Sequence, residues 1–491
     1  MSPFKPTILT LLGWLIASVV VAADRPNIVW IIIDDMSANL SCYGEETVET
    51  PHLDALAESG LRFSKAFVTA PVCSTNRSAF ITGMYQTTIG SHQHRSGRGE
   101  LKIHLPDGVR PIPEMFQEAG YHTAITGWPN KGRDSGGKTD YNFEWDRGMY
   151  DDPDWGKRSP GQPFFAQIHL PGGKHRGGNI EQSRQFAQRM KELFGESVDP
   201  AKVTLPPYYP DHPVLREDWA AYLDSVKLTD KFVGDIVARL RSEGDLENTV
   251  VVFMTDHGIS HARGKQFLYE EGIHVPLIIA GPGIESGKVR DDLVEHIDIA
   301  ALSLGLAEID VPDYMQAKDI LSDEYEPRTE IYSARDRCDE TVEHMRCVRT
   351  QEFKYIRNFL PNRPHMQPNR YKDQKSIVVA LRSLFEAKKL TEVQARIFQP
   401  KRPEEELYDL RNDPFEIRNL ADDPEYQQRL LSMRAKLDTW IEESGDRGRE
   451  SETMYDSDMA VYVNSQRRSP DQIDVLKRNI ALMKRWQSRS K

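Results

Sequence analysis

Two apolar runs that each end abruptly in acidic residues constrain the fold of this chain most. The run "NIVWIII" is followed by Asp34 and Asp35, and the run "VVVFM" is followed, after one threonine, by Asp256 and His257. A short run that is apolar on both faces is typical of a strand buried in a parallel sheet with helices on either side. Because the loops at the carboxyl ends of such strands meet at one edge of the sheet, we expect these four polar residues to lie together.

The rest of the chain alternates between strand-like and helix-like patterns up to about residue 325. This alternation predicts an α/β fold, with a large mixed, mostly parallel sheet flanked by helices in a domain over residues 24–325. Shorter strand candidates and a turn-rich segment then predict a smaller C-terminal α+β domain over residues 326–441. Residues 442–491 are expected to form a polar, irregular tail that ends in an amphipathic helix.

The first 23 residues have the layout of a secretory signal peptide. Lys5 precedes an apolar run over about residues 8–21, and Ala22 and Ala23 supply a small-residue cleavage site. An uncleaved membrane anchor is the alternative, but the run is shorter than the ~20 residues that a membrane-spanning helix needs. We therefore expect an exported, periplasmic or extracellular protein with no stable membrane insertion after cleavage.

Net charge and cysteine content exclude some classes of protein. The formal net charge of -12 argues against nucleic acid or an anionic membrane as the main partner. Four cysteines without a zinc-binding spacing argue against both a disulfide scaffold and structural zinc. Two of them, Cys338 and Cys347, are close enough in sequence to close a small loop by a disulfide bond.

The acidic ends of the two apolar runs predict a metal site. Asp34, Asp35, Asp256 and His257 offer mainly carboxylate oxygens, which favour a hard divalent cation such as calcium or magnesium over zinc. A single Asp-Asp pair after a strand is more often a turn or a helix cap. Two such ends after two buried strands favour the metal site.

A cysteine in the stretch "APVCSTNRSAFITG" needs its own explanation. Cys73 precedes a predicted helix, and Arg77 lies in the first turn of that helix. The guanidinium group and the free backbone N–H groups of a helix N-terminus can hold an anion near residue 73. Neither a nucleophilic triad pattern nor a zinc-binding spacing accounts for this thiol.

These motifs, taken in their order along the chain, resemble those of the type I sulfatases of the alkaline-phosphatase-like superfamily. The resemblance covers about residues 25–440 and rests on "NIVWIIIDD", "APVCSTNRSAFITG", "TDHG", "RGKQFLYEEG" and "ELYDLRNDPFEIRNLADDP". It implies hydrolysis of sulfate esters, or of N-sulfate groups, on a sulfated carbohydrate. The alternatives are a phosphoester hydrolase on the same fold and a non-catalytic binder of sulfated glycans.

The resemblance also implies a modified nucleophile. In that family a formylglycine-generating enzyme oxidises the motif cysteine, here Cys73, to formylglycine, and the aldehyde hydrate attacks sulfur. Arg77 would hold this group. The metal ligands, usually for calcium, would be the four residues named above together with residue 73. Thr75 stands where the motif expects proline or alanine, which leaves the efficiency of conversion open.

Further roles follow from the resemblance residue by residue. Lys265 and Lys138 would bind the sulfate oxygens, with Lys131 as the alternative to Lys138. His175 would protonate the leaving oxygen, with His169 as the alternative. Asp140 stands at the spacing of a histidine found in many members, so its role is open.

Basic side chains near these motifs predict a rim that attracts a polyanionic substrate. Among them, His92 and Arg95 are candidates for substrate binding, together with Asp140. The plain alternative is that these are ordinary charges on solvated loops. In the smaller domain, Arg335, Asp336 and His344 are candidates for substrate specificity.

Overall fold

The computed structural model describes residues 25–129, 136–449 and 453–489. The expected signal peptide, residues 1–23, and Lys131 therefore lie outside the described residues. Within the described ranges, no helix is long and apolar enough to cross a membrane.

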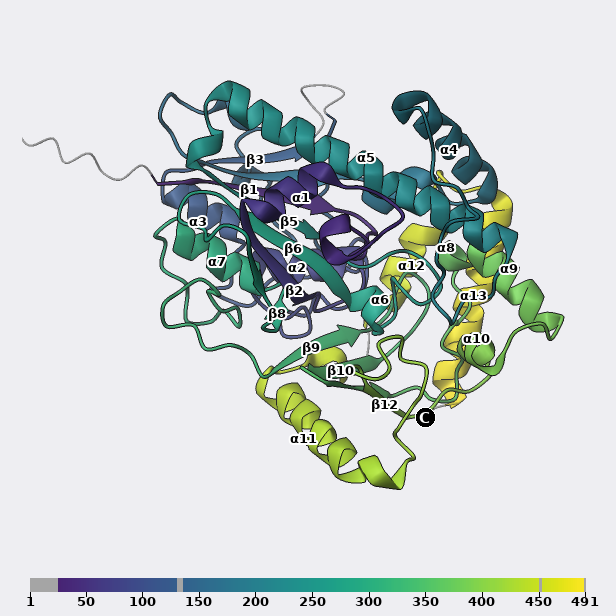
Figure 1. Ribbon diagram of the computed structural model, residues 1–491. Helices are drawn as coiled ribbons and strands as arrows, with labels where there is room; N and C mark the ends of the chain where they lie inside the picture. Colours follow the sequence, from purple (N-terminus) through teal and green to yellow (C-terminus); the bar gives the residue numbers. More distant parts are fainter. Residues whose placement is uncertain (1–24, 130–135, 450–452, 490–491) are drawn as a thin grey trace, which may run out of the picture.

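One large sheet forms the centre of the molecule (Figure 1). Its strand order is β3-β4-β1-β5-β6-β2-β7, with β8 paired to β2. The central pairs β3-β4, β4-β1 and β1-β5 are parallel, whereas β6 runs antiparallel to both β5 and β2. The strands are β1 (Asn27–Ile33), β2 (Gly60–Phe67), β3 (His122–Gly127), β4 (Phe164–Leu170), β5 (Thr249–Thr255), β6 (His274–Ala280), β7 (Lys288–Arg290) and β8 (Val294–Glu295).

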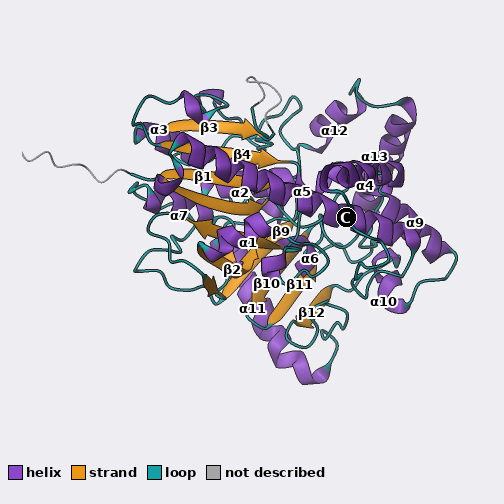
Figure 2. Ribbon diagram, turned by 45° about the horizontal axis from the view of Figure 1, so that its top comes forward, coloured by secondary structure: helices purple, strands orange, loops and turns teal. Residues whose placement is uncertain are grey.

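Helices cover both faces of this sheet (Figure 2). Successive side chains of β1 are buried in two different clusters, because alternate residues of a strand point to opposite faces. Val29 and Ile31 pack in the cluster of α1 and α5, and Ile28 and Trp30 pack in the cluster of α2, α3 and α7. The helices named here are α1 (Pro51–Glu58), α2 (Cys73–Thr82), α3 (Ile112–Glu118), α5 (Pro213–Glu243) and α7 (Asp298–Leu306).

A second, smaller sheet follows the large one. It is antiparallel, with the order β12-β11-β10-β9. Its strands are β9 (Glu330–Arg335), β10 (Met345–Thr350), β11 (Phe353–Asn358) and β12 (Glu405–Asp409). Helix α11 (Gln427–Glu443) packs on this sheet through Leu430, Met433 and Leu437. The predicted α/β fold with a large, mostly parallel sheet and a smaller α+β part is confirmed, while the domain boundary near residue 325 stays a prediction.

The other helices pack on α5 or lie in the second half of the chain. Helix α4 packs against α5, and so does α9, which follows β11 of the small sheet in the sequence. These helices are α4 (Ile180–Phe194), α6 (Glu270–Ile273), α8 (Arg370–Asp373), α9 (Ser376–Glu386), α10 (Glu392–Ala395), α12 (Tyr455–Val463) and α13 (Pro470–Arg489).

Two expectations are corrected by the structure. The segment expected to be irregular before the last helix contains α12, because Tyr455, Met459 and Tyr462 recur at helical spacing and are buried against α13. The disulfide considered for Cys338 and Cys347 is absent, and both thiols are free and buried. Cys347 lies in β10 with its side chain in the main core, whereas Cys338 lies in the loop after β9.

Candidate active site

The adjacent parallel strands β1 and β5 bring their acidic ends together, as the sequence predicts. Ile33 pairs with Thr255, so the residues that follow leave the sheet at the same level. The backbone N–H of Asp35 lies 3.3 Å from Oδ1 of Asp256. His257 Nε2 lies 3.2 Å from Oδ1 of Asp35 and 3.3 Å from Oδ1 of Asp256.

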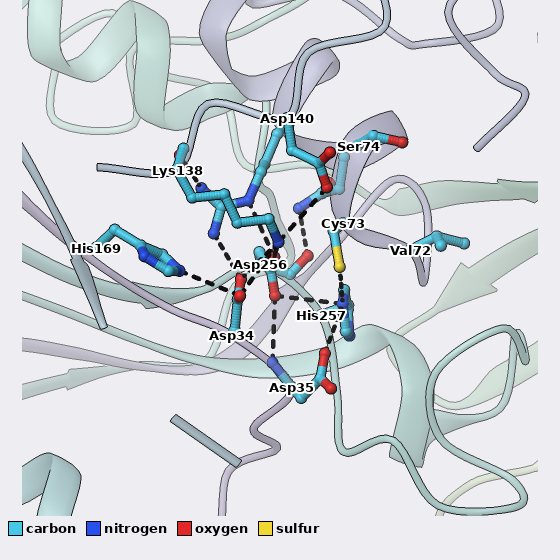
Figure 3. A network of polar contacts seen from close by, with 12 residues as sticks. Asp34, Asp35, Val72, Cys73, Ser74, Lys138, Asp140, His169, Asp256 and His257 are labelled. Atoms are coloured by element: carbon cyan, nitrogen blue, oxygen red, sulfur yellow. Dashed lines mark hydrogen bonds and ion pairs between the residues drawn. The ribbon is translucent and has the colours of Figure 1, made fainter. Parts of the chain in front are cut away.

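Cys73 lies beside this group at the first residue of α2 (Figure 3). Its buried Sγ is 3.0 Å from His257 Nε2 and 3.0 Å from Lys265 Nζ. One ligand atom from each of Asp35, Cys73, Asp256 and His257 lies within 4.8 Å of the others. Because α2 begins here, its free N–H groups also add partial positive charge at residue 73.

Arg77 connects the two acidic strand ends from the next turn of α2. Its Nη2 lies 2.7 Å from Oδ1 of Asp34, and its Nε lies 3.0 Å from Oδ2 of Asp256. The same guanidinium donates from Nη1 to the carbonyl oxygen of Lys138 at 3.0 Å. Arg77 therefore fixes the orientation of both carboxylates and the position of the Lys138 loop.

Three lysines point into the same space. Lys138 Nζ lies 3.1 Å from Oδ2 of Asp34, and Lys265 Nζ lies 3.0 Å from Oδ1 of Asp35. Lys174, which the sequence reasoning missed, forms an ion pair with Asp34 and lies 3.8 Å from Asp35. Together with Arg77, four permanent cations surround three carboxylates, which is an excess suited to an anion.

The pKa values of the three carboxyl groups differ for physical reasons. Burial by itself raises the pKa of Asp34 and Asp35, but neighbouring lysines more than offset burial and hold both values well below the usual range. Burial, followed by repulsion from Asp34, raises the pKa of Asp256 to about 7. A divalent cation bound here would reduce the repulsion between these carboxylates and favour the ionised form of Asp256. The donor set is also rich in oxygen, which hard cations prefer. The residues present thus fit a hard cation.

The two candidate histidines lie in different surroundings. His169 lies near the carboxyl end of β4, and its Nε2 is 3.1 Å from Oδ2 of Asp34 (Figure 3). His175 packs instead on helices, with its ring centre 6.1 Å from that of Phe186 and 5.9 Å from that of Phe232. The structure therefore brings His169 into the cluster and does not bring His175 there.

The predicted basic rim divides into two places. Asp140 pairs with Arg98 and lies 3.6 Å from Arg95 Nε and 3.5 Å from Lys138 Nζ, so this group borders the site. His92 is elsewhere. It lines a separate cavity of about 330 Å³ with Gln93, Ser96 and His104, among others. Burial, followed by the charge of Arg346, lowers the pKa of His92 to about 3.

Tyr371 is a further residue that the sequence reasoning missed. It comes from α8, far along the chain, and its hydroxyl donates to Oδ2 of Asp35 at 3.3 Å. No local motif marks this tyrosine, because its position depends on how α8 packs against the loop of Lys265. Lys174, by contrast, stands in the same short "PGGKHRG" stretch that drew attention to His175.

Comparison with known proteins agrees with this geometry. Residues 26–309 match the Sulfatase family, and residues 257–400 match the family described as N-sulphoglucosamine sulphohydrolase, C-terminal. An ulvan-active sulfatase from Formosa agariphila is 31% identical over 462 residues, which are 86% of this chain and 76% of the relative. Human N-sulphoglucosamine sulphohydrolase is 26% identical over 474 residues, or 86% of this chain and 91% of that protein.

Solved structures show the same fold. A structure described as a 2-O GAG sulfatase has a TM-score of 0.62 at 20% identity, covering 87% of this chain and 94% of the other. A second, in complex with its substrate D-glucosamine-2-N,6-O-disulfate, has a TM-score of 0.60 at 18% identity, with 87% and 100% coverage. With the family match over more than half of its length and a relative at 31% identity, this chain belongs to the sulfatase family, with its alkaline-phosphatase-like fold, and is a sulfuric ester hydrolase.

Proposed function

We propose that this sulfatase is exported and removes sulfate esters or N-sulfate groups from a carbohydrate, with residue 73 as formylglycine. The observation that carries the proposal is the placement of Cys73, whose Sγ lies 3.0 Å from both Lys265 Nζ and His257 Nε2 at a helix N-terminus. The names of two relatives, an ulvan-active sulfatase and N-sulphoglucosamine sulphohydrolase, support a sulfated carbohydrate as the substrate class.

The cation site would be formed by Asp35, Asp256, His257 and residue 73, whose ligand atoms already lie within 4.8 Å of one another. Asp34, the remaining predicted ligand, lies at its border, held by Arg77 and Lys138. A bound calcium ion, or magnesium in its place, would supply positive charge that favours deprotonation of a nearby hydroxyl group. The carboxylate-rich donor set supports a hard divalent cation over zinc, and the choice of calcium rests on the resemblance to the sulfatases.

The side chains around residue 73 have roles that follow from their contacts. Sγ of Cys73 would stand in for a hydrate oxygen of formylglycine. Lys265, 3.0 Å away, would stabilise negative charge on that oxygen and on the sulfate that binds beside it. Lys138 and Lys174 would bind the other sulfate oxygens, since both approach the same carboxylate, Asp34.

Protonation of the leaving oxygen needs a group at the edge of the cluster. The geometry favours His169, because its Nε2 lies 3.1 Å from Asp34 within the site, and its side chain keeps 15% of its surface exposed. Burial, only partly offset by Asp34, lowers the pKa of His169. His175 remains the candidate from sequence resemblance, and its ring packs against Phe186 and Phe232.

Maturation is tested on the peptide itself. Digestion of protein purified from its natural host with trypsin releases residues 66–77, which include Cys73 and end at Arg77. Mass spectrometry should show an aldehyde in place of the thiol, which requires that the formylglycine-generating enzyme accepts Thr75. Finding only unmodified cysteine would contradict the formylglycine mechanism.

A further inference from the structure

Three cations of the smaller part of the chain lie buried close to the active site without an ion-pair partner. They are Arg335 at the end of β9, Lys372 in α8 and Lys375 just after α8, and we call them the basic cluster. Their exposed fractions are 3%, 0% and 9%. In the described ranges none of the three has a carboxylate within 4.0 Å, although buried arginines such as Arg402 and Arg346 do.

One aromatic ring joins two members of this cluster, and a second connects the cluster to the reaction centre. Phe267 lies under both Arg335, at 5.5 Å, and Lys372, at 5.6 Å. Tyr371 lies between Lys375, at 5.0 Å from its ring centre, and Lys265, at 5.2 Å. Because Lys265 itself contacts Cys73 Sγ, two side chains, Tyr371 and Lys265, separate Lys375 from the reacting position.

Part of the hydrogen-bonding capacity of the cluster is unused. Nε and Nη1 of Arg335 are fully buried and have no hydrogen-bond partner among the described residues. The acid that acts on Arg335 most strongly, Glu343, is already held by both Nη atoms of Arg402. An ammonium group has three donors, and the one acceptor found for Lys372 Nζ is the carbonyl oxygen of His261.

Such an arrangement is costly for a folded protein. A buried charge without a carboxylate partner loses its hydration, and contacts with aromatic rings and one carbonyl oxygen return only part of that cost. Burial lowers the pKa of Lys372 well below its usual value, and the charges of Lys265, Arg335 and Lys375 lower it further. The cluster is therefore incomplete until an anion balances it.

We propose that the basic cluster binds a second anionic group of the substrate, next to the sulfate that is removed. This inference rests on the proposed function and narrows it to sugars that carry two negative charges, the second being a carboxylate or a further sulfate. Arg335 offers a planar pair of donors for either group, and Lys375 offers a point charge.

The test compares probes with one and with two negative charges. We would measure kcat and KM of wild type, Arg335→Met and Lys375→Met on 4-nitrophenyl sulfate, on D-glucosamine-2-N,6-O-disulfate and on a sulfated disaccharide with a uronic acid. Lys288→Met, an exposed lysine paired with Glu285, is the control. We expect KM to rise at least about tenfold on a doubly charged probe, with changes below about twofold on 4-nitrophenyl sulfate.

The pattern of loss decides the outcome. A loss confined to the disulfate assigns the second group as sulfate, and a loss confined to the uronic-acid probe assigns it as carboxylate. Equal losses on singly and doubly charged probes, or no change on any probe, would overturn the proposal.

A melting experiment separates binding from a structural role. Because Arg335 is buried without a partner, Arg335→Met should leave the melting temperature of the free enzyme unchanged or raise it. A lower melting temperature would show that Arg335 stabilises the fold and would count against the binding role.

Calorimetric titration of the disulfate and of the uronic-acid probe keeps this inference separate from the proposed function. If wild type binds one of them and hydrolyses no probe, the proposed function fails while weaker binding to Arg335→Met still supports the basic cluster. If wild type hydrolyses a doubly charged probe and Arg335→Met binds it equally well, the basic cluster fails alone.

Discussion

Buried charges are arranged differently in two neighbouring regions of this molecule. Beside the small sheet, Arg402 has a carboxylate of its own, Glu343, and both side chains are fully buried. In the reaction centre, charges are shared, and Lys138 Nζ lies 3.1 Å from Asp34, 3.5 Å from Asp140 and 3.8 Å from Asp256.

The difference shows which charges serve the fold and which serve a ligand. We call a buried cation and a carboxylate that pair with each other, such as Arg402 and Glu343, a closed pair. Both charges of a closed pair are compensated in the folded chain, so removing one partner leaves the other buried and unpaired. A shared set with excess cations, or a cluster without any carboxylate, is satisfied only when an ion or a substrate is added. Substitutions in the first region should therefore lower stability, and substitutions in the second should lower activity.

The largest expected effect comes from Asp256. Asp256→Ala should reduce kcat/KM at least about 10⁴-fold, because it removes a proposed cation ligand and a contact of Arg77. The melting temperature without added calcium should not fall, since burial and Asp34 already raise the pKa of this carboxyl group to about 7. Calcium should raise the melting temperature of wild type and not of the variant. Unchanged turnover would show that Asp256 has no role in catalysis. Asp323→Ala, at an exposed position, serves as the control.

The next effect separates the two histidines. His169→Gln should lower kcat about 10²- to 10³-fold, with a larger loss for poor leaving groups, because a general acid contributes about that much. His175→Gln should change kcat by less than about threefold, since His175 packs against Phe186 and Phe232 outside the cluster. The reverse ranking in steady-state kinetics would assign the acid to His175.

Much of the fold and of the shared-charge region could be predicted from the sequence. Asp34 and Asp256 follow runs so apolar that only a doubly covered parallel sheet accommodates them, and parallel strands end at one edge. Local spacing could not rank His169 against His175, because the fold decides that His169 in β4 lies 3.1 Å from Asp34 while His175, after β4, packs against Phe186 and Phe232. It also could not place Tyr371 or the basic cluster, whose positions depend on the packing of α8 against a loop about a hundred residues earlier in the chain.

The closed-pair region should respond in the opposite way. Arg402→Met should lower the free energy of unfolding by about 4 kcal/mol, because Glu343 then remains buried and unpaired. The folded variant should keep kcat/KM on 4-nitrophenyl sulfate within about threefold of wild type. Arg411→Met, which breaks an exposed pair with Glu352, should cost less than about 1 kcal/mol in the same urea titration. If Arg402→Met lost activity without losing stability, the proposed difference between the two regions would be wrong.

Acid should reduce the stability that the Arg402–Glu343 pair contributes to the fold. Burial would raise the pKa of Glu343, but Arg402 outweighs burial and lowers this pKa to about 2. The unfolded chain therefore takes up the proton first, and the stability that Glu343 contributes above its unfolded pKa of about 4.3 is lost as pH falls toward 2. Between pH 5 and pH 3, wild type should lose on the order of 2 kcal/mol more than Glu343→Gln in urea titrations, although the variant is less stable at pH 7. The control Glu324→Gln, at an exposed position, should show the same pH dependence of stability as wild type. Parallel pH curves for wild type and Glu343→Gln would show that Arg402 does not lower the pKa of Glu343.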